Sequence, residues 1–292
     1  MFGVAPGTAR ESVVGKTTLA GHAIYTNVAV ADDNTPWWEG LSPPPPRAVS
    51  WLRREWAPAS GAPAAHANSR FTVPTENCPT LDAAWQHPAG VPISAIIFGG
   101  RRDDTVPLIQ QALNFEHGVL VAATLSSQTT AAAVGAQGAL RFDPMSMRPF
   151  IGYDFASYCA HWLAMPALQQ AAAPGTKTPL PLIFQANVFR KAGGKFLFPG
   201  FGDNVRLLRW VLGRVDATAS ATETATGFSP DAEALCASLP MAPGAAAALT
   251  RIDHQEWVAE VARMKMFLAE VGAPPELVAR AAWLGERVSR MT

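Results

Sequence analysis

The sequence predicts a mixed α/β (α+β) fold, and three observations support this class. Two short apolar runs that end in loop residues, 91–100 (VPISAIIFGG) and 180–187 (LPLIFQAN), have the length and composition of buried strands. The 25 prolines and 23 glycines among 292 residues indicate that much of the remaining chain is loop. Apolar side chains recur at helical spacing in four longer segments: 155–168, 205–215, 256–268 and 275–291.

The amino-terminal part of the chain, residues 1–70, is dominated by turn signals. Pro6-Gly7, the polar segment 31–36 and the run Pro43–Pro46 separate short β-rich pieces such as 23–30 (AIYTNVAV). Short strands joined by loops are therefore expected here.

A strand, a loop and a helix are predicted in succession from residue 91. The strand 91–100 ends in two glycines that open the loop Gly-Gly-Arg-Arg (99–102), and 105–114 (TVPLIQQALN) has helical spacing with Pro107 in its first turn. The apolar run 118–123 then leads into 124–139, whose many small residues give it little to bury. We expect 124–139 to form a mobile lid.

The carboxyl-terminal part predicts the domain boundaries. Residues 217–226 are rich in Ala, Thr and Ser, a composition typical of linkers. The predicted organisation is one domain over 1–215, a linker over 216–230 and a helical segment over 231–292.

The charge balance and the cysteines exclude several classes of protein. Lys+Arg and Asp+Glu both number 23, which gives no long-range field to attract nucleic acid or an anionic membrane. Residues 117–140 carry no charged side chain, but their polar centre argues against a membrane span. Cys78, Cys159 and Cys236 are odd in number and lack CxxC spacing, so neither a disulfide framework nor a zinc knuckle is predicted. With no leader pattern at the amino end, a cytoplasmic protein is expected.

The first candidate for chemistry is 13–18 (VVGKTT), because Gly-Lys-Thr opening a helix can cradle phosphates. A phosphate loop also requires a glycine five positions before Gly15, and that position is Arg10. A solvated loop is therefore favoured over a phosphate site.

The second candidate combines 68–70 (NSR) with 99–102 (GGRR). Glycines at a strand end let the backbone approach a ligand closely, and a guanidinium binds phosphate or carboxylate in a bidentate manner. The alternative is a set of surface arginines in ordinary salt bridges.

The third candidate is 188–204 (VFRKAGGKFLFPGFGDN), in which aromatic residues alternate with Gly, Pro and basic residues. Aromatic faces can sandwich a flat base, and the amide of Asn204 can hydrogen-bond its edge, which would make a purine pocket. The alternative is a hairpin whose aromatic side chains belong to the core.

Other common sites are not indicated. The six histidines show no metal-binding spacing, and there is no GxSxG nucleophile motif. Asp143, Arg148 and Asp154 frame a segment that we interpret as scaffold.

Several blocks taken together resemble one family. They are FGVAPGT at 2–8, ANSRF at 67–71, IIFGGRR at 96–102, DPMSMRPFIGYDF at 143–155 with AHW at 160–162, and FPGFGDN at 198–204. In this order they resemble the GTP-dependent phosphoenolpyruvate carboxykinases, over nearly the whole chain. The resemblance implies a nucleotide-binding catalytic domain, present in part, with carboxyl-terminal helices.

The resemblance also implies an activity and roles for single residues. The family converts oxaloacetate and GTP to phosphoenolpyruvate, GDP and CO2, a reaction of gluconeogenesis that uses Mn²⁺ or Mg²⁺. It implies that Arg70 contacts the substrate carboxylate or phosphoryl group beside Asn68, and that Arg101 contacts the nucleotide phosphates. The guanine pocket it implies consists of Phe189, Phe196, Phe201 and Asn204, with Val4 and Pro6 at its wall.

The chain also departs from the family pattern. In the predicted lid, Ser126 and Gln128 replace an expected Arg and Glu, and 134–136 (VGA) replace charged residues, so closure lacks interactions that would favour it. The family's phosphate loop and its Lys, His and Asp metal ligands belong to a preceding segment that is not in this sequence. We therefore expect no metal site and no catalysis by this chain alone. The alternatives are a non-enzymatic guanine-nucleotide or anion-binding fragment, or one half of a split enzyme completed by an amino-terminal partner.

Overall fold

The computed structural model describes residues 2–3, 21–130, 137–175 and 179–291. The chain divides into two compact units. The first comprises Met1–Val91 with Thr129–Ala139, and the second comprises Pro92–Gln128 with Leu140–Thr292. Each unit is described by itself.

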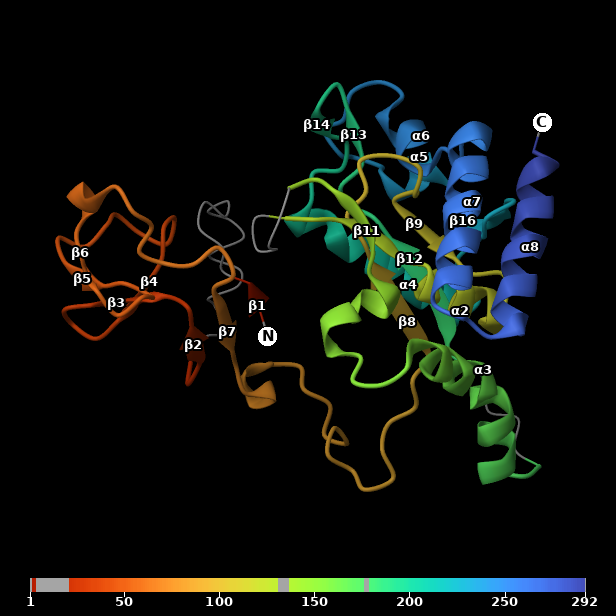
Figure 1. Cartoon of the computed structure of the whole chain (residues 1–292), viewed down its shortest axis with the longest axis horizontal. Helices are drawn as coiled ribbons and strands as arrows, with labels where there is room; N and C mark the ends of the chain where they lie inside the picture. The colour runs from red at the N-terminus through yellow and green to blue at the C-terminus, as the bar shows by residue number, and fades with distance from the viewer. Residues whose placement is uncertain (1, 4–20, 131–136, 176–178, 292) are drawn as a thin grey trace. The chain divides into compact units, whose positions relative to one another are not determined.

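The first unit consists of short antiparallel strands and loops (Figure 1). A three-stranded sheet has the order β1-β7-β2, and a four-stranded sheet has the order β4-β3-β5-β6. Trp38 and Phe71 are buried in one small apolar cluster, and Trp37 and Trp56 in another. The strands are β1 (Phe2–Gly3), β2 (Ile24–Thr26), β3 (Ala29–Ala31), β4 (Pro36–Trp37), β5 (Ala48–Val49), β6 (Glu55–Trp56) and β7 (Arg70–Thr72), with 3-10 turns at Pro58–Ser60 and Thr75–Asn77. The short strands predicted for this region are confirmed.

The second unit is built on a five-stranded mixed sheet with the order β15-β16-β9-β12-β8. The central strand β12 is parallel to β8 and antiparallel to β9, and the three lie side by side in Figure 1. The strands are β8 (Ala95–Gly99), β9 (Ile109–Gln111), β12 (Leu182–Ala186), β15 (Thr222–Glu223) and β16 (Phe228–Ser229). Two separate hairpins pair β10 (Ser126–Gln128) with β11 (Leu140–Phe142) and β13 (Lys191–Ala192) with β14 (Lys195–Phe196).

Helices cover both faces of this sheet. Neighbouring side chains of a strand point to opposite faces, so two successive residues of β12 pack against different helices. Ile183 of β12 packs into a core with the helices α2, α7 and α8, whereas Phe184 packs with α4 and α6. The helices are α2 (Phe115–Ala123), α3 (Phe155–Ala172), α4 (Asn204–Val215), α5 (Ala232–Leu235), α6 (Ala245–Thr250), α7 (His254–Glu270) and α8 (Pro275–Ser289), with 3-10 turns at Pro144–Ser146, Arg148–Phe150 and Phe201–Asp203. The mixed α/β class is confirmed.

Side-chain caps fix where four of these helices begin. The side chains of Asn114, Asp154, Asp231 and Asp253 accept backbone N–H bonds in the first turns of α2, α3, α5 and α7. Asp143 likewise accepts the N–H of Arg148, whose guanidinium donates to the carbonyl of Phe142. This local role agrees with the interpretation of 143–154 as scaffold.

The helix predicted over 105–114 is wrong. The segment is an irregular loop followed by β9, and its side chains from Thr105 to Ala112 are buried on all sides. Periodicity does not separate a fully buried strand from a buried helix, so the helical spacing was fortuitous.

The predicted linker and domain boundaries also differ from the structure. Within 216–230, β15 and β16 add two strands to the edge of the main sheet, so backbone pairing holds a segment whose small side chains suggested a linker. The chain divides at Val91 rather than near 215. The lid predicted over 124–139 includes residues 131–136, which lie outside the described residues. Residues 129–130 continue from β10, and residues 137–139 lead into β11.

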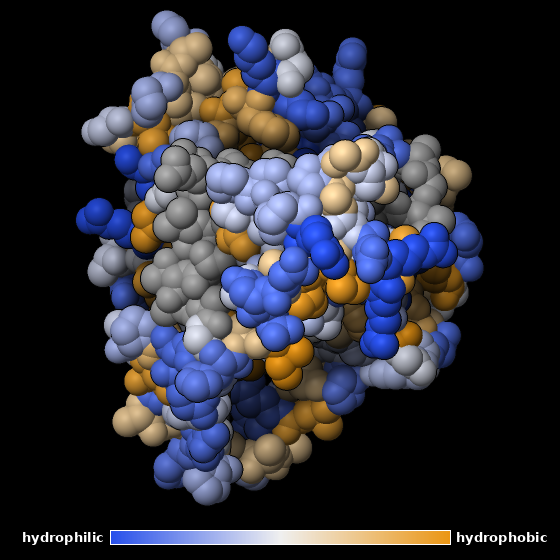
Figure 2. Space-filling model, turned by 90° about the vertical axis from the view of Figure 1, so that its left-hand side faces the viewer, coloured by the Kyte–Doolittle hydropathy of each residue, from blue (hydrophilic) through white to orange (hydrophobic). Residues whose placement is uncertain are grey.

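The face drawn in Figure 2 is mixed in polarity. Figure 2 shows apolar residues in scattered groups between hydrophilic ones, a distribution that is usual for globular proteins. Cys78, Cys159 and Cys236 are free thiols, and the last two are buried. Within the described residues, no helix is both long and apolar enough to cross a membrane.

Candidate functional site

The candidate site of the second unit lies where two parallel strands end. β8 and β12 pair in parallel with Gly99 opposite Ala186, so the chain leaves both strands at the same edge of the sheet. The loop 100–104 follows β8, and the segment 187–190 follows β12. Ligands of α/β proteins bind at this carboxyl edge of parallel strands.

The loop after β8 is held closely against β10. The backbone N–H of Arg101 donates to Oγ of Ser127 at 3.0 Å, and its carbonyl accepts from the N–H of Gln128 at 2.8 Å. A Cβ at Gly100 would lie 2.9 Å from the carbonyl oxygen of Ser126, so this approach requires glycine. The backbone of Arg101 is thereby fixed.

The side chain of Arg101 stacks on an aromatic pair. Its guanidinium carbon lies 3.9 Å from the ring centre of Phe189, and the Phe189 ring meets Phe196 edge to face at 6.1 Å. Nζ of Lys191 lies 5.1 Å from the Phe196 ring centre and 3.2 Å from Oδ1 of Asp103. Burial lowers the pKa of Arg101, and the Asp103 charge opposes that shift; an arginine remains cationic in proteins. The result is a cationic group beside flat apolar faces.

Arg102 has a different environment. Its side chain is buried and forms a bidentate pair with Glu260 of α7, at 2.8 and 3.1 Å. Oγ of Ser126 accepts from Arg102 at 2.7 Å and donates to Glu260 at 3.1 Å, and Arg263 also pairs with Glu260 at 2.8 Å. Arg102 therefore anchors the loop to α7 and β10.

The other predicted pocket residues are placed less completely. Phe196 is half-exposed, whereas its neighbour Phe198 is 2% exposed and belongs to the core. Phe201 begins the 3-10 turn before α4, and its side chain lies outside what the structure describes. Asn204 begins α4, and its Oδ1 is buried without a hydrogen-bond partner among the described residues. An unsatisfied buried acceptor of this kind has a free-energy cost unless a ligand donates to it.

Asn68 and Arg70 lie in the first unit. Arg70 begins β7, the middle strand of its sheet, and its Nη1 lies 3.4 Å from the carbonyl of Ser69. The backbone of Asn68 is held by Nδ1 of His66 at 3.0 Å and by the amide of Asn27 at 3.2 Å. Oδ1 of Asn68 is buried and has no partner in the described part of the chain. Val4 and Pro6, like the segment 13–18, lie outside the described residues.

Sequence reasoning missed three residues that organise the site: Ser127, Asn187 and Glu260. Asn187 directly follows a predicted strand, a position where ligand contacts are common, and that placement was a usable signal. Glu260 falls on the apolar face of α7 with Trp257, Val261 and Met264. A carboxylate on a buried helix face needs a cationic partner, and that too was a signal. Nothing in the sequence pointed to Ser127.

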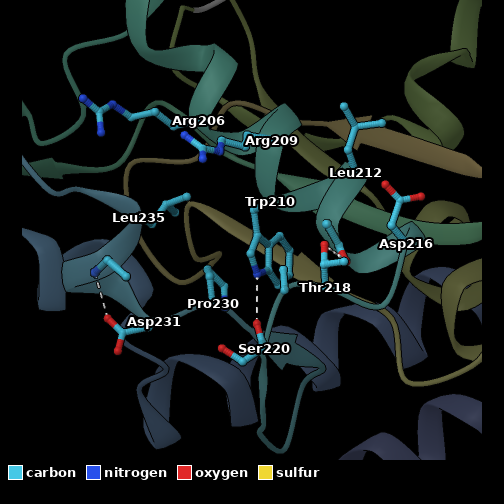
Figure 3. A pocket seen from close by; sticks show the side chains of 13 residues that line it. Arg206, Arg209, Trp210, Leu212, Asp216, Thr218, Ser220, Pro230, Asp231 and Leu235 are labelled. Carbon is cyan, nitrogen blue, oxygen red and sulfur yellow. Dashed lines mark hydrogen bonds between the residues drawn. The ribbon is translucent and has the colours of Figure 1, made fainter.

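A pocket of about 740 Å³ in the second unit lies away from these residues, between α4 and α5 (Figure 3). Arg206, Arg209 and Asp216 line it, so it holds charges of both signs. Arg206 already pairs with Asp203 at 3.0 Å, and Nε1 of Trp210 donates to the carbonyl of Ser220 at 3.2 Å. None of the predicted site residues lines this pocket.

The described residues do not fit the divalent metal that the resemblance implies. Among residues 2–3, 21–130, 137–175 and 179–291, no group of three His, Cys, Asp or Glu side chains could hold a metal ion. The steps proposed below therefore involve only this chain's arginine, asparagine and aromatic residues.

The fold places the protein in the mixed α/β class. Residues 1–287 match the family model described as the phosphoenolpyruvate carboxykinase C-terminal P-loop domain, and the chain belongs to this family. Three curated relatives are GTP-dependent phosphoenolpyruvate carboxykinases.

The three relatives come from different bacteria. The enzyme of Chlamydia abortus (strain DSM 27085 / S26/3) is 44% identical over 277 residues, 93% of this chain and 45% of the relative. That of Anaeromyxobacter sp. (strain K) is 45% identical over 293 residues, 98% of this chain and 48% of the relative. That of Paenarthrobacter aurescens (strain TC1) is 43% identical over 277 residues, again 93% and 45%. The chain thus spans about half the length of the curated relatives it matches.

Proposed function

We propose that this chain supplies the guanine-nucleotide and anion-binding part of a GTP-dependent phosphoenolpyruvate carboxykinase. The observation that carries the proposal is the Arg101 guanidinium held over Phe189 at the carboxyl edge of β8 and β12. A fixed cation beside aromatic faces suits a ligand that joins a flat base to phosphates.

Guanine specificity rests on Asn204. The Watson–Crick edge of guanine presents two neighbouring N–H donors, whereas adenine presents an acceptor beside a single donor. The buried Oδ1 of Asn204, which has no hydrogen-bond partner among the described residues, is an acceptor that matches guanine. Phe189 and Phe196 provide the stacking surface in this proposal.

The proposed role of Arg70 is to bind the carboxylate of oxaloacetate or phosphoenolpyruvate, with Asn68 beside it. The buried Oδ1 of Asn68 and the position of Arg70 on a central strand support a fixed site. A guanidinium binds a carboxylate through two parallel hydrogen bonds, which fixes orientation as well as charge.

The proposed reaction depends on positioning and charge. Cleavage of the bond to the departing carboxylate releases CO2 and leaves its electron pair in an enolate, whose oxygen attacks the γ-phosphorus of GTP while GDP departs. Arg70 orients the carboxylate that remains, and Arg101 stabilises negative charge on the phosphates. Neither residue forms a covalent bond to the substrate.

The 292-residue chain assayed by itself is expected to bind nucleotide without turnover. The test is phosphoenolpyruvate formation from oxaloacetate and GTP with added Mn²⁺. Turnover by the chain alone would contradict this expectation, and turnover only with an added amino-terminal segment would favour the split-enzyme alternative. Nucleotide binding with no turnover in either arrangement would favour a non-enzymatic binding protein.

Calorimetric titration with GDP and ADP tests the nucleotide site itself. GDP is expected to bind about tenfold or more tightly than ADP, since one lost or unsatisfied hydrogen bond has a free-energy cost of roughly 1–3 kcal/mol. Arg101→Ala is expected to weaken GDP binding by about tenfold or more. Arg209→Ala is the matched control, because Arg209 is an exposed arginine of the same unit that does not belong to the proposed site. Equal losses in both variants would mean a general charge effect and would contradict the proposal.

A further inference from the structure

The side chain of Asn187 joins the two loops of the candidate site. Its Oδ1 accepts the backbone N–H of Arg102 at 3.1 Å and that of Phe189 at 3.2 Å. Its Nδ2 donates to the carbonyls of Arg102 at 3.0 Å and Val106 at 2.9 Å. One amide group thus bonds the loop after β8 and the segment after β12.

These four bonds use the complete hydrogen-bonding capacity of an asparagine side chain, which has two acceptor lone pairs and two donor hydrogens. Both acceptor contacts are to N–H groups and both donor contacts are to carbonyls, so the orientation of the amide is determined by its partners. Asn187 is 1% exposed, and no solvent replaces a bond that is lost. A residue of another type would leave buried backbone groups unpaired.

Asn187 bonds to the neighbour of one predicted ligand contact and directly to the backbone of another. Arg102 follows Arg101, which the resemblance assigns to the nucleotide phosphates, and Phe189 belongs to the aromatic surface for the base. The bonds to Ser127 and Gln128 fix Arg101 against β10 but do not reach Phe189. Asn187 thus bonds directly to both loops. A second link lies farther along, where the backbone N–H of Lys191 donates to the carbonyl of Asp103 at 2.9 Å and Nζ of Lys191 lies 3.2 Å from Oδ1 of Asp103.

We propose that Asn187 is a positioning residue, which holds Arg101 in register with Phe189 so that the phosphate and base contacts of one nucleotide keep a fixed separation. The role in nucleotide binding rests on the proposed function; the register of Arg101 and Phe189 does not. Asn187 itself touches no substrate in this proposal. Preorganisation of this kind avoids the ordering cost of bringing two loops together when the ligand binds.

The matched control lies two residues earlier, on β12. Gln185 is also buried, at 7% exposed, and its amide oxygen accepts from Gln110 at 2.8 Å. Gln185→Ala therefore removes a buried amide from β12 without touching the site loops. Asn187→Ala and Asn187→Asp are the test variants, and the second keeps the size and the acceptor oxygen but removes both donors.

The first measurement needs no nucleotide. Because Arg101 lies over the Phe189 ring, its side-chain protons are expected to show upfield ring-current shifts in the NMR spectrum, which Phe189→Leu abolishes. We expect these shifts to disappear in Asn187→Ala and to persist in Gln185→Ala. Retention of the shifts in Asn187→Ala would overturn the proposal.

The second measurement compares GDP with guanosine, which lacks the phosphates. In Asn187→Ala the preference for GDP over guanosine is expected to fall about tenfold, the effect of losing one charge-assisted hydrogen bond, while guanosine affinity changes little. A merely structural role would weaken both ligands alike, and that result would overturn the positioning role. If the unaltered chain binds neither ligand, the proposed function fails, and the ring-current measurement still decides whether Asn187 sets the register.

A third measurement uses the unaltered chain, in case neither Asn187 variant folds. Both side-chain amide protons of Asn187 are expected to exchange with solvent as slowly as core backbone amides, because both are donated to buried carbonyls. Rapid exchange of these protons would overturn the proposal.

Discussion

Arg101 and Arg102 are neighbours in the chain, yet their surroundings give them different roles. Arg101 stacks on Phe189 and is only partly buried, whereas Arg102 is buried against Glu260. Two charges removed from water need good geometry and further hydrogen bonds to be stable, and Ser126 and Arg263 supply them here. The residue proposed to bind the nucleotide phosphates thus stands beside the anchor of its own loop.

Replacing Glu260 tests the anchor. Glu260→Ala leaves the buried Arg102 without its carboxylate and is expected to lower the free energy of unfolding by about 3–5 kcal/mol, measured by chemical denaturation. Glu286→Ala is the control, since Glu286 forms an exposed 4.0 Å pair with Arg290 that should be worth less than about 1 kcal/mol. A loss as small as that of the control would contradict the structural role of the Arg102–Glu260 pair.

His117 of α2 predicts a pH dependence of stability. Burial, with the nearby Arg280 and Arg287 charges, lowers its pKa from 6.5 to about 3, and its Nδ1 accepts the N–H of Leu113. As the pH falls from 6.5 toward 3, the unfolded chain binds a proton here that the folded chain does not, so stability falls with pH in this window. At neutral pH the contribution is fully present.

The contribution of His117 to the free energy of unfolding is measurable between pH 6.5 and pH 5, above the range in which ordinary carboxylates titrate. Over this interval the free energy of unfolding of the unaltered chain is expected to fall by about 1.5–2 kcal/mol more than that of His117→Gln. Parallel pH curves for the two proteins would show that His117 is not held neutral by the fold.

At the residue scale, the sequence predicted the type of group better than its environment. The Gly-Gly-Arg-Arg motif after an apolar run was visible, and the structure shows an arginine stacked on an aromatic residue there. The pairing of Arg102 with Glu260, which lies 158 residues away in the sequence, could not be predicted. Ion pairs between distant segments leave no local periodicity.

At the scale of single elements, α2 and β12 pack very closely at Gly118 of α2. A Cβ at Gly118 would lie 2.5 Å from Cδ1 and 2.6 Å from Cβ of Ile183. These distances are too short for any rotamer change at Ile183 to relieve, since its Cβ does not move with its rotamer. The glycine sets how closely α2 approaches the sheet.

Gly118→Ala is therefore expected to destabilise the chain, although alanine is the better helix former. Overpacking should lower the free energy of unfolding by about 1–3 kcal/mol and outweigh a propensity gain of up to about 1 kcal/mol. The control is Gly152→Ala, where no atom lies within 4 Å of the added Cβ. Denaturation curves that place Gly118→Ala at or above the stability of the control would contradict this packing.

The elements that sequence reasoning predicted correctly are those with one clear period. α4, α7 and α8 are amphipathic helices, and β8 and β12 are short apolar runs bounded by loop residues. The errors fall on β9, which is buried on both faces, and on β15 and β16, which are only two residues long each. In these three strands the pairing partners, rather than local composition, determine the structure.

At the scale of the whole molecule, the second unit is formed by two separate stretches of sequence. The interruption, Thr129–Ala139, connects Gln128 of β10 to Leu140 of β11, which face each other in the hairpin register. A two-residue Asn-Gly turn can join such a pair. The second unit should therefore fold without the first.

The corresponding variant is residues 92–292 with 129–139 replaced by Asn-Gly. It is expected to unfold in one cooperative transition and to keep the Arg101 ring-current shifts. A noncooperative transition, or loss of those shifts, would mean that the first unit is needed to form the site edge.

The central claim is that the chain binds a guanine nucleotide where β8 and β12 end. The most direct test is an NMR titration of the whole chain with GDP, with the perturbed resonances mapped onto the structure. Saturable shifts are expected at Arg101, Phe189, Phe196 and Asn204, and ADP should not reproduce them. Shifts confined to the pocket between α4 and α5, or an equal response to ADP, would contradict it.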